Sequence, residues 1–180
     1  MKKSISKKAI VYIALFIMMV ALGFNKAYAK YYNSDEKIMM DVSKYMVEEN
    51  GERYFDLEKA KKDNVRDEVI DLGNLVNDLA SEWGFRQDRE VKFRSLFPIG
   101  SYGNFCGKGN NGWDKYPIDD LDAACKGHDK CFVWGGDNTA CNTQFCKELD
   151  WVIKFAQDGS RKKAYAMAAK VLFGCSKYGY

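Results

Sequence analysis

The sequence is poor in histidine and proline: its 180 residues contain one histidine, His128, and two prolines. A single histidine excludes multi-histidine zinc sites and the histidine-rich metal centres of phosphohydrolases. Few prolines, with 47% hydrophobic and 29% charged residues, exclude a disordered or low-complexity chain. The length suits one compact domain with a small appendage and is too short for two ordinary catalytic domains.

Acidic residues are missing from residues 1–29, which hold five lysines. A basic start, an uncharged run from Ala9 to Phe24 and a small-residue cleavage site at Ala27-Tyr28-Ala29 predict a secretory signal peptide over residues 1–29. The alternative is an uncleaved membrane anchor, for which the run is short, since a span needs about 20 apolar residues. The secreted chain would carry 23 basic and 25 acidic residues, a balance that argues against a nucleic-acid partner.

Cysteine is absent between residues 30 and 105, and all six cysteines follow. In an exported protein an even number predicts three disulfides, and the lack of a Cys-x2-Cys pair argues against zinc. No free thiol would remain for a Cys-His protease. Six cysteines can pair in many ways, which their spacing alone does not decide. The six are Cys106, Cys125, Cys131, Cys141, Cys146 and Cys175.

Hydrophobic spacing predicts a mainly α-helical fold. A helix is expected from Ser34, as N-cap, to a stop at Gly51, because Ile38, Val42, Tyr45 and Met46 follow helical spacing. Further helices are expected over residues 56–62, 65–83, 119–134, 141–156 and 161–173. We therefore expect a helical N-terminal extension over residues 30–92 and a second domain over residues 93–180.

Glycines, aromatic residues and short polar residues dominate from Phe93 to Pro117, which predicts a long functional loop. Gly107 to Gly112 fits the GxGxxG pattern, but neither a preceding strand nor a following helix is indicated, so a dinucleotide site is excluded. Ser101 lacks the first glycine of a nucleophile elbow.

The helix over residues 119–134 places Cys125, His128 and Asp129 on one surface. If Cys125 pairs with Cys106, carbonyls of the glycine-rich loop can join the Asp129 carboxylate around a hard cation, for which Ca²⁺ is the best candidate. If Cys131 pairs with Cys141, Asn142 is the residue best placed to contact the imidazole. Cys146 and Cys175 would then remain for the third bridge.

At these residues the sequence resembles the secreted phospholipase A2 family. Tyr102 to Gly109 is similar to that family's calcium loop, and Asp119 to Cys131 is similar to its catalytic helix. The likeness covers residues 101–145, about a quarter of the chain, and implies a disulfide-stapled antiparallel helix pair with a calcium-binding loop.

The resemblance also implies roles for individual residues. His128 would be the general base, and Asp129 would bind Ca²⁺ together with the backbone carbonyls of Phe105, Gly107 and Gly109. The ion and the Gly107 amide would stabilise the oxyanion formed at the sn-2 ester of a glycerophospholipid. The products would be a lysophospholipid and a free fatty acid, and the partner would be a phospholipid membrane surface or vesicle.

Asn142 and Phe132 depart from the family's pattern. The family usually has an aspartate at the position of Asn142, and many members have an aromatic hydroxyl at that of Phe132. An amide orients the ring but cannot stabilise an imidazolium by charge, and in a serine protease the analogous change costs about 10⁴ in rate through the wrong tautomer. Asn104 and Ala124 stand where venom and pancreatic members have further cysteines, which implies a sparser, prokaryotic-like member.

Three questions stay open. The first is whether the protein is an enzyme, a phospholipase A2-like binding protein or toxin, or a calcium-stapled structural module. The second is whether the extension is a packing layer, an inhibitory pro-segment or an arm for a protein partner that the sequence does not identify. The third is which surroundings two groups of side chains face. The apolar group faces either a lipid surface or the core, and consists of Phe93, Leu96, Phe97, Ile99 and Trp113. The basic group faces either lipid headgroups or plain solvent, and consists of Arg161, Lys162, Lys163, Lys170 and Lys177.

Overall fold

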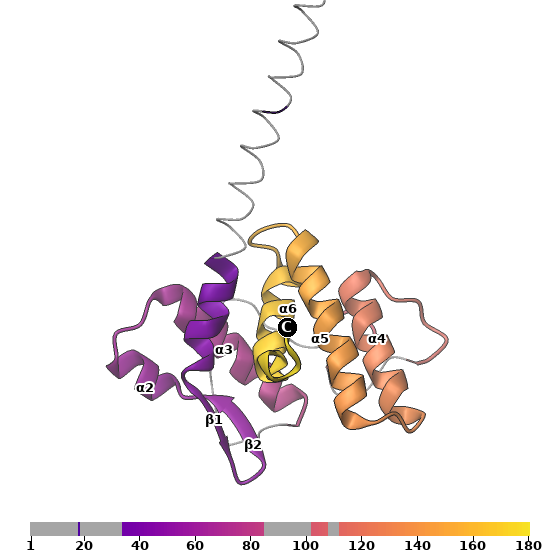
Figure 1. Ribbon diagram of the computed structural model, residues 1–180, viewed down its shortest axis with the longest axis horizontal. Helices are drawn as coiled ribbons and strands as arrows, with labels where there is room; N and C mark the ends of the chain where they lie inside the picture. The colour runs from indigo at the N-terminus through magenta and orange to yellow at the C-terminus, as the bar shows by residue number, and fades with distance from the viewer. Residues whose placement is uncertain (1–17, 19–33, 85–101, 108–111) are drawn as a thin grey trace, which may run out of the picture. The chain divides into compact units, whose positions relative to one another are not determined.

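The computed structural model describes residues 18, 34–84, 102–107 and 112–180 (Figure 1). Residues 38–180 pack as one unit. The expected cleavage site, the expected boundary between residues 92 and 93, and the calcium ligand expected at Gly109 lie outside the described residues. Over the described ranges, no helix is both long and apolar enough to cross a membrane.

A β-hairpin interrupts the extension, which the sequence analysis expected to be helical. Helix covers residues 34–43, and strands β1 (Met46–Glu49) and β2 (Glu52–Phe55) then pair antiparallel, with Met46 opposite Phe55. The expected helix from Ser34 to Gly51 is therefore wrong beyond residue 43. Gly51 is no helix stop: with Asn50 it adopts positive φ, 81° and 54°, which is the backbone of a two-residue hairpin turn.

Helices α2 (Leu57–Lys62) and α3 (Asp67–Glu82) complete the extension. The Asp56 carboxylate caps α2 by accepting from the Lys59 amide at 2.9 Å. Asn77 of α3 ties the hairpin to this helix, because its side chain bonds both the N–H and the C=O of Phe55, at 2.8 and 2.9 Å. The Phe55 ring occupies the space beside Gly73, where a Cβ would lie 2.3 Å from it.

The C-terminal half contains α4 (Asp120–Val133), α5 (Asn138–Phe155), α6 (Arg161–Leu172) and the 3₁₀ helix η1 (Cys175–Tyr178). These bounds confirm the expected helices to within three residues. The largest difference is the start of α5, where the Asp137 carboxylate accepts from the Ala140 amide at 3.0 Å and caps the helix earlier than expected.

Helix α6 packs against both α3 and α5, and α5 packs against α4. The extension and the C-terminal half therefore share one hydrophobic core. The largest fully buried side chains come from both halves of the chain. They include Phe55, Val76, Leu79, Leu121, Phe145, Leu149, Tyr165 and Leu172.

Candidate active site

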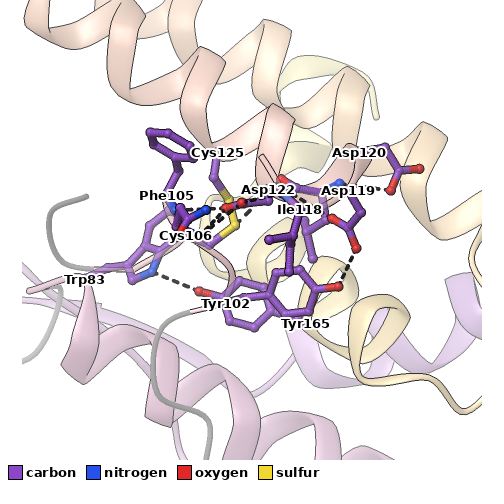
Figure 2. Close-up of a disulfide and its surroundings, with 12 residues drawn as sticks. Trp83, Tyr102, Phe105, Cys106, Ile118, Asp119, Asp120, Asp122, Cys125 and Tyr165 are labelled. Atoms are coloured by element: carbon purple, nitrogen blue, oxygen red, sulfur yellow. Dashed lines mark hydrogen bonds between the residues drawn. A yellow bond between two sulfur atoms is a disulfide. The ribbon is translucent and has the colours of Figure 1, made fainter. Parts of the chain in front are cut away.

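The Asp122 carboxylate organises the start of the expected calcium loop (Figure 2). It is fully buried in α4 and accepts from the backbone amides of Asn104 at 3.0 Å and Phe105 at 2.8 Å. It also accepts from the amide of Ile118 at 3.0 Å, on the limb that returns to α4. Gly103 has φ 64°, and a Cβ there would lie 2.3 Å from this carboxylate. One buried anion therefore fixes both limbs of the loop.

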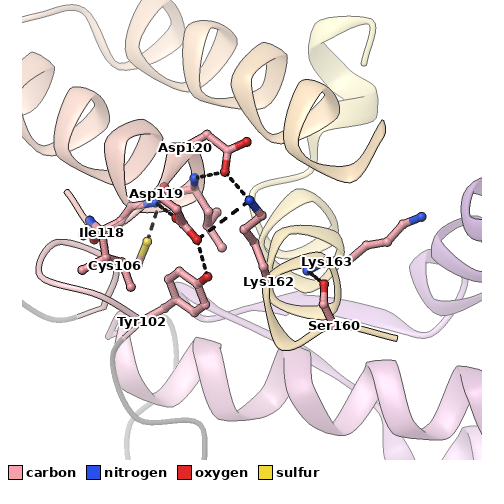
Figure 3. Close-up of polar contacts among 10 residues, drawn as sticks. Tyr102, Cys106, Ile118, Asp119, Asp120, Ser160, Lys162 and Lys163 are labelled. Atoms are coloured by element: carbon pink, nitrogen blue, oxygen red, sulfur yellow. Dashed lines mark hydrogen bonds and ion pairs between the residues drawn. The ribbon is translucent and has the colours of Figure 1, made fainter. Parts of the chain in front are cut away.

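Tyr102 and Asp119 join the loop to the N-terminus of α4 (Figure 3). The Tyr102 hydroxyl donates to Asp119 at 2.6 Å, and Asp119 caps α4 by accepting from the amide of Asp122 at 3.1 Å. Burial and the neighbouring carboxylate raise the pKa of Tyr102, so the phenol stays protonated. Lys162 at the start of α6 pairs with Asp120 at 2.6 Å, which fixes α6 to the same helix end.

Two side chains hold the returning limb of the loop through its carbonyls. Asn104 donates to the carbonyl of Tyr116 at 2.9 Å. Lys126 of α4 donates to the carbonyls of Lys115 at 2.6 Å and Trp113 at 3.4 Å. Its ammonium also lies 4.4 Å from the centre of the buried Phe105 ring. Polar contacts to α4 thus fix the backbone on both sides of the glycine-rich segment.

His128 lies among aromatic rings. Its ring stacks on Phe145 at a centroid distance of 4.4 Å and meets Phe132 and Phe173 edge to face at 4.8 and 5.1 Å. The Trp83 ring is also stacked with it, at a centroid distance of 6.3 Å and an interplanar angle of 26°. Burial lowers the pKa of His128 below its ordinary value of 6.5, and the hydrogen bond with Asn142 partly offsets this effect. The imidazole is therefore neutral at neutral pH.

Asn142 contacts the imidazole, as the sequence analysis expected. Its Oδ1 lies 2.9 Å from Nε2 of His128. An amide oxygen only accepts, so in this contact the hydrogen is on Nε2 and Nδ1 carries a lone pair. The aromatic hydroxyl missing at Phe132 is supplied from elsewhere, because the hydroxyl of Tyr178 in η1 lies 3.3 Å from Nδ2 of Asn142.

Asp129 is half-buried in α4 next to His128. Burial alone raises the pKa of Asp129 to about 6, which means that its ionised form lacks a compensating charge in the described part of the chain. A hard cation would remove that penalty, and a carboxylate combined with backbone carbonyls is a donor set suited to calcium. The described residues contain no group of three His, Cys, Asp or Glu side chains placed to hold a metal, and the expected set needs only one such side chain.

The three disulfides join the pairs considered above. Cys106 is bonded to Cys125, Cys131 to Cys141 and Cys146 to Cys175. The first bonds the loop to α4 one helical turn before Asp129, and the second brings Asn142 beside His128. Phe105 and Gly107 lie in the described part of the loop, and Gly107 has φ 122°.

Sequence reasoning did not identify several residues that build the site. Asp122 had a usable signal, since it precedes Cys125 by three residues and so shares its helix face. Trp83 ends the hydrophobic stripe of α3, but nothing in the stripe indicated that it reaches His128. Tyr178 gave no local signal at all, and neither did Asn138, whose Oδ1 lies 3.3 Å from Nδ2 of Asn142.

Comparison with known proteins gives partial matches. No protein-family model matches the chain, and no solved structure matches it. Acidic phospholipase A2 2 of Naja sagittifera is 34% identical over 67 residues, which are 36% of this chain and 51% of that protein. Phospholipase A2-beta of Arabidopsis thaliana is 38% identical over 64 residues, 34% of this chain and 44% of the plant protein.

A third relative is the acidic phospholipase A2 homolog taipoxin gamma chain of Oxyuranus scutellatus scutellatus, 48% identical over 42 residues, 23% of this chain and 26% of the toxin chain. The chain thus spans about half or less of the length of these curated relatives. Over these partial segments the chain is therefore similar in sequence to phospholipases A2.

Proposed function

We propose that this protein is a secreted, calcium-dependent phospholipase A2 that hydrolyses the sn-2 ester of glycerophospholipids. The observation that carries the proposal is the contact between Nε2 of His128 and Oδ1 of Asn142 at 2.9 Å. It gives a neutral, oriented imidazole beside Asp129 and the disulfide-bonded loop. A binding protein has no need of such an imidazole.

His128 acts as the general base through Nδ1. As water attacks the ester carbonyl, Nδ1 takes a proton from it, and the Nε2–H group keeps its hydrogen bond to Asn142. The lowered pKa of His128 keeps the base unprotonated at neutral pH. The imidazolium formed during the reaction faces an amide and aromatic rings, with no carboxylate among its described contacts, so we expect slower turnover than an aspartate would give.

The expected calcium ligands are the Asp129 carboxylate and the backbone carbonyls of Phe105, Gly107 and Gly109. When bound there, the ion would polarise the ester carbonyl and hold the substrate phosphate. The Gly107 amide donates to the oxyanion. The contacts of Asp122 with the amides of Asn104 and Phe105 fix the backbone beside the Phe105 carbonyl before substrate arrives.

Exposed aromatic residues near the loop support a lipid surface as the partner. Trp113 and Trp134 stack at a centroid distance of 6.5 Å and are 41% and 75% exposed. Lys130 lies 5.3 Å from the Trp134 ring, so apolar and cationic groups stand together, as at membrane interfaces.

The basic C-terminal residues support lipid binding less well. The side chains of four of them pair with acidic residues of this chain: Lys162 with Asp120, Lys163 with Asp158, Lys170 with Asp150 and Lys177 with Glu48. These ion pairs favour a structural role for the basic residues over headgroup binding.

A phospholipase A2-like binding protein is the second candidate, because Asn142 replaces the usual aspartate. Vesicles labelled separately at sn-1 and sn-2 discriminate the two, with fatty acid release followed in calcium and in EDTA. The enzyme releases label from sn-2 in calcium only, and His128→Gln abolishes that release while the fold is kept. Calcium binding without release would identify a non-catalytic relative, and release by His128→Gln would make the assigned base wrong.

A further inference from the structure

The amide of Asn142 is held from three directions. Its Oδ1 faces Nε2 of His128 at 2.9 Å. Its Nδ2 lies 3.3 Å from Oδ1 of Asn138, the first residue of α5. The same Nδ2 lies 3.3 Å from the hydroxyl of Tyr178, the last residue of η1. Three elements of the fold therefore meet at one side-chain amide.

The orientation of this amide decides which nitrogen of His128 can accept a proton. With Oδ1 toward the ring, Nε2 carries the hydrogen and Nδ1 is the acceptor. A reversed amide would place its NH₂ group against Nε2, which would force the hydrogen onto Nδ1 and remove the base. An aspartate presents oxygen in either orientation, so only an amide at this position needs its orientation fixed.

We propose that Asn138 and Tyr178 are positioning residues that hold the Asn142 amide with its oxygen toward His128 and so select the Nε2–H tautomer. Oδ1 of Asn138 accepts one amide hydrogen of Asn142, and the Tyr178 oxygen accepts the other. In the reversed orientation, the Asn142 oxygen would face both groups, so neither bond could form again unless the Asn138 amide also rotated and the Tyr178 hydroxyl turned from acceptor to donor. The tautomer belongs to the resting protein, and its catalytic consequence rests on the proposed function.

A set of variants separates orientation from general damage. Asn138→Ala with Tyr178→Phe removes both acceptors. Asn138 is exposed, and Tyr178→Phe loses only the hydroxyl, so the aromatic ring keeps its packing. Asn138→Asp is the matched control, because a carboxylate can only accept and so forces the proposed orientation. The double variant is also combined with Asn142→Asp, because a carboxylate presents oxygen to His128 in either orientation.

Heteronuclear NMR of the ring nitrogens reads the tautomer directly, since His128 is the only histidine in the protein. The purified protein in EDTA, at a pH where the imidazole is neutral, should show the Nε2–H form, and Asn138→Asp should show it too. The double variant should lose the preference for the Nε2–H form. The same double variant made together with Asn142→Asp should keep the Nε2–H form. Retention of the Nε2–H form by the double variant with Asn142 intact would overturn the proposal, as would a change of tautomer in Asn138→Asp.

Hydrolysis of sn-2-labelled vesicles adds the kinetic consequence. In the double variant we expect kcat to fall about tenfold or more, toward the ~10⁴ loss known for a wrong histidine tautomer, with KM little changed. Adding Asn142→Asp to the double variant should restore kcat. If the tautomers respond as expected but no variant hydrolyses lipid, the positioning role stands and the proposed function fails. If hydrolysis is present and the tautomer ignores both residues, the positioning role fails alone.

Discussion

The indole of Trp83 stacks against the imidazole of His128, with ring centroids 6.3 Å apart and an interplanar angle of 26°. Trp83 directly follows α3, and His128 is in α4. The indole also contacts Phe173 at 4.8 Å and donates from Nε1 to the Tyr165 hydroxyl at 3.3 Å. The N-terminal extension thus supplies one wall of the environment that lowers the pKa of the histidine.

Replacing Trp83 by alanine should change both stability and the histidine. We expect the free energy of unfolding to fall by about 2–3 kcal/mol, less than the ~3–5 kcal/mol typical of a buried tryptophan, because Trp83 is only partly buried. Water entering beside the imidazole should move the pKa of His128 toward 6.5. Urea unfolding and NMR titration measure the two effects. Trp83→Phe, which keeps an aromatic ring, should retain most of the stability and most of the lowering of the His128 pKa. An unchanged His128 pKa in the alanine variant would argue against this role of Trp83.

Removing residues 30–92 should leave an insoluble chain. The deletion takes α3 away from α6 and Trp83 away from His128, which exposes apolar surface that the rest of the protein cannot cover. Solubility and circular dichroism of the remaining chain, residues 93–180, check this expectation. A soluble remainder with higher lipase activity would instead support the inhibitory pro-segment.

Asp122→Asn should disorder the proposed calcium loop. The amide brings an NH₂ group toward backbone N–H donors that now point at oxygen, so at least one buried donor loses its partner, at a cost of about 2 kcal/mol or more. Calcium affinity should fall with it, because the loop carbonyls lose their fixed positions. Asp120→Asn is the control on the same helix, since its carboxylate is exposed and losing its surface ion pair with Lys162 should cost less than about 1 kcal/mol. Thermal unfolding and calcium titration would show no difference between the two variants if Asp122 were unimportant.

Asp129→Asn should stabilise the calcium-free protein at neutral pH. The raised pKa of Asp129, about 6 against 3.8, means that the folded state holds its proton more tightly than the unfolded state. The fold therefore loses stability as the pH rises from 3.8 to about 6, carries the full penalty above that, and regains stability on acidification. The melting temperature of the variant in EDTA should exceed that of the natural protein at pH 7, and the difference should shrink as the pH falls.

Calcium should reverse the order of the two melting temperatures, because only the natural protein gains stability from the ion. Asp120→Asn serves again as the surface control. Equal stabilisation of Asp129→Asn and the natural protein by calcium would place the ion elsewhere.

Trp134→Ala should weaken attachment to phospholipid vesicles roughly tenfold, or about 1.4 kcal/mol. Its indole is exposed beside Trp113 and Lys130, near the loop. Trp151→Ala is the matched control, because that indole is 60% exposed on α5 and packs on Phe155. Sedimentation with vesicles measures the binding. The same loss in both variants would show general hydrophobicity rather than a defined lipid surface.

The helices of this fold were predictable from sequence because each has a long hydrophobic stripe or a capping residue such as Asp56, Asp119 or Ser160. The hairpin was missed because four-residue strands are too short to show alternation, and Tyr45 and Met46 also suit helical spacing. Asn50-Gly51 was the available signal, since this dipeptide favours a two-residue hairpin turn.

The contacts of the candidate site were also predictable from sequence only in part. The contact of His128 with Asn142 followed from spacing once a pairing of Cys131 with Cys141 was assumed, and the structure confirms it. The contact of Asn142 with Tyr178 joins residues 36 positions apart, through an element whose path depends on packing of the whole C-terminal half. No local pattern encodes that distance.

The disulfide between Cys146 and Cys175 also ties the histidine to the redox state of its surroundings. Cys175 opens the 3₁₀ helix that carries Tyr178, so the hydroxyl that reaches Asn142 is kept near α5 by a covalent bond. In a reducing compartment such bonds do not persist, and the C-terminal segment is then free to leave. The surroundings of the imidazole are therefore complete only once the chain is oxidised, so the proposed hydrolysis would begin only outside a reducing compartment.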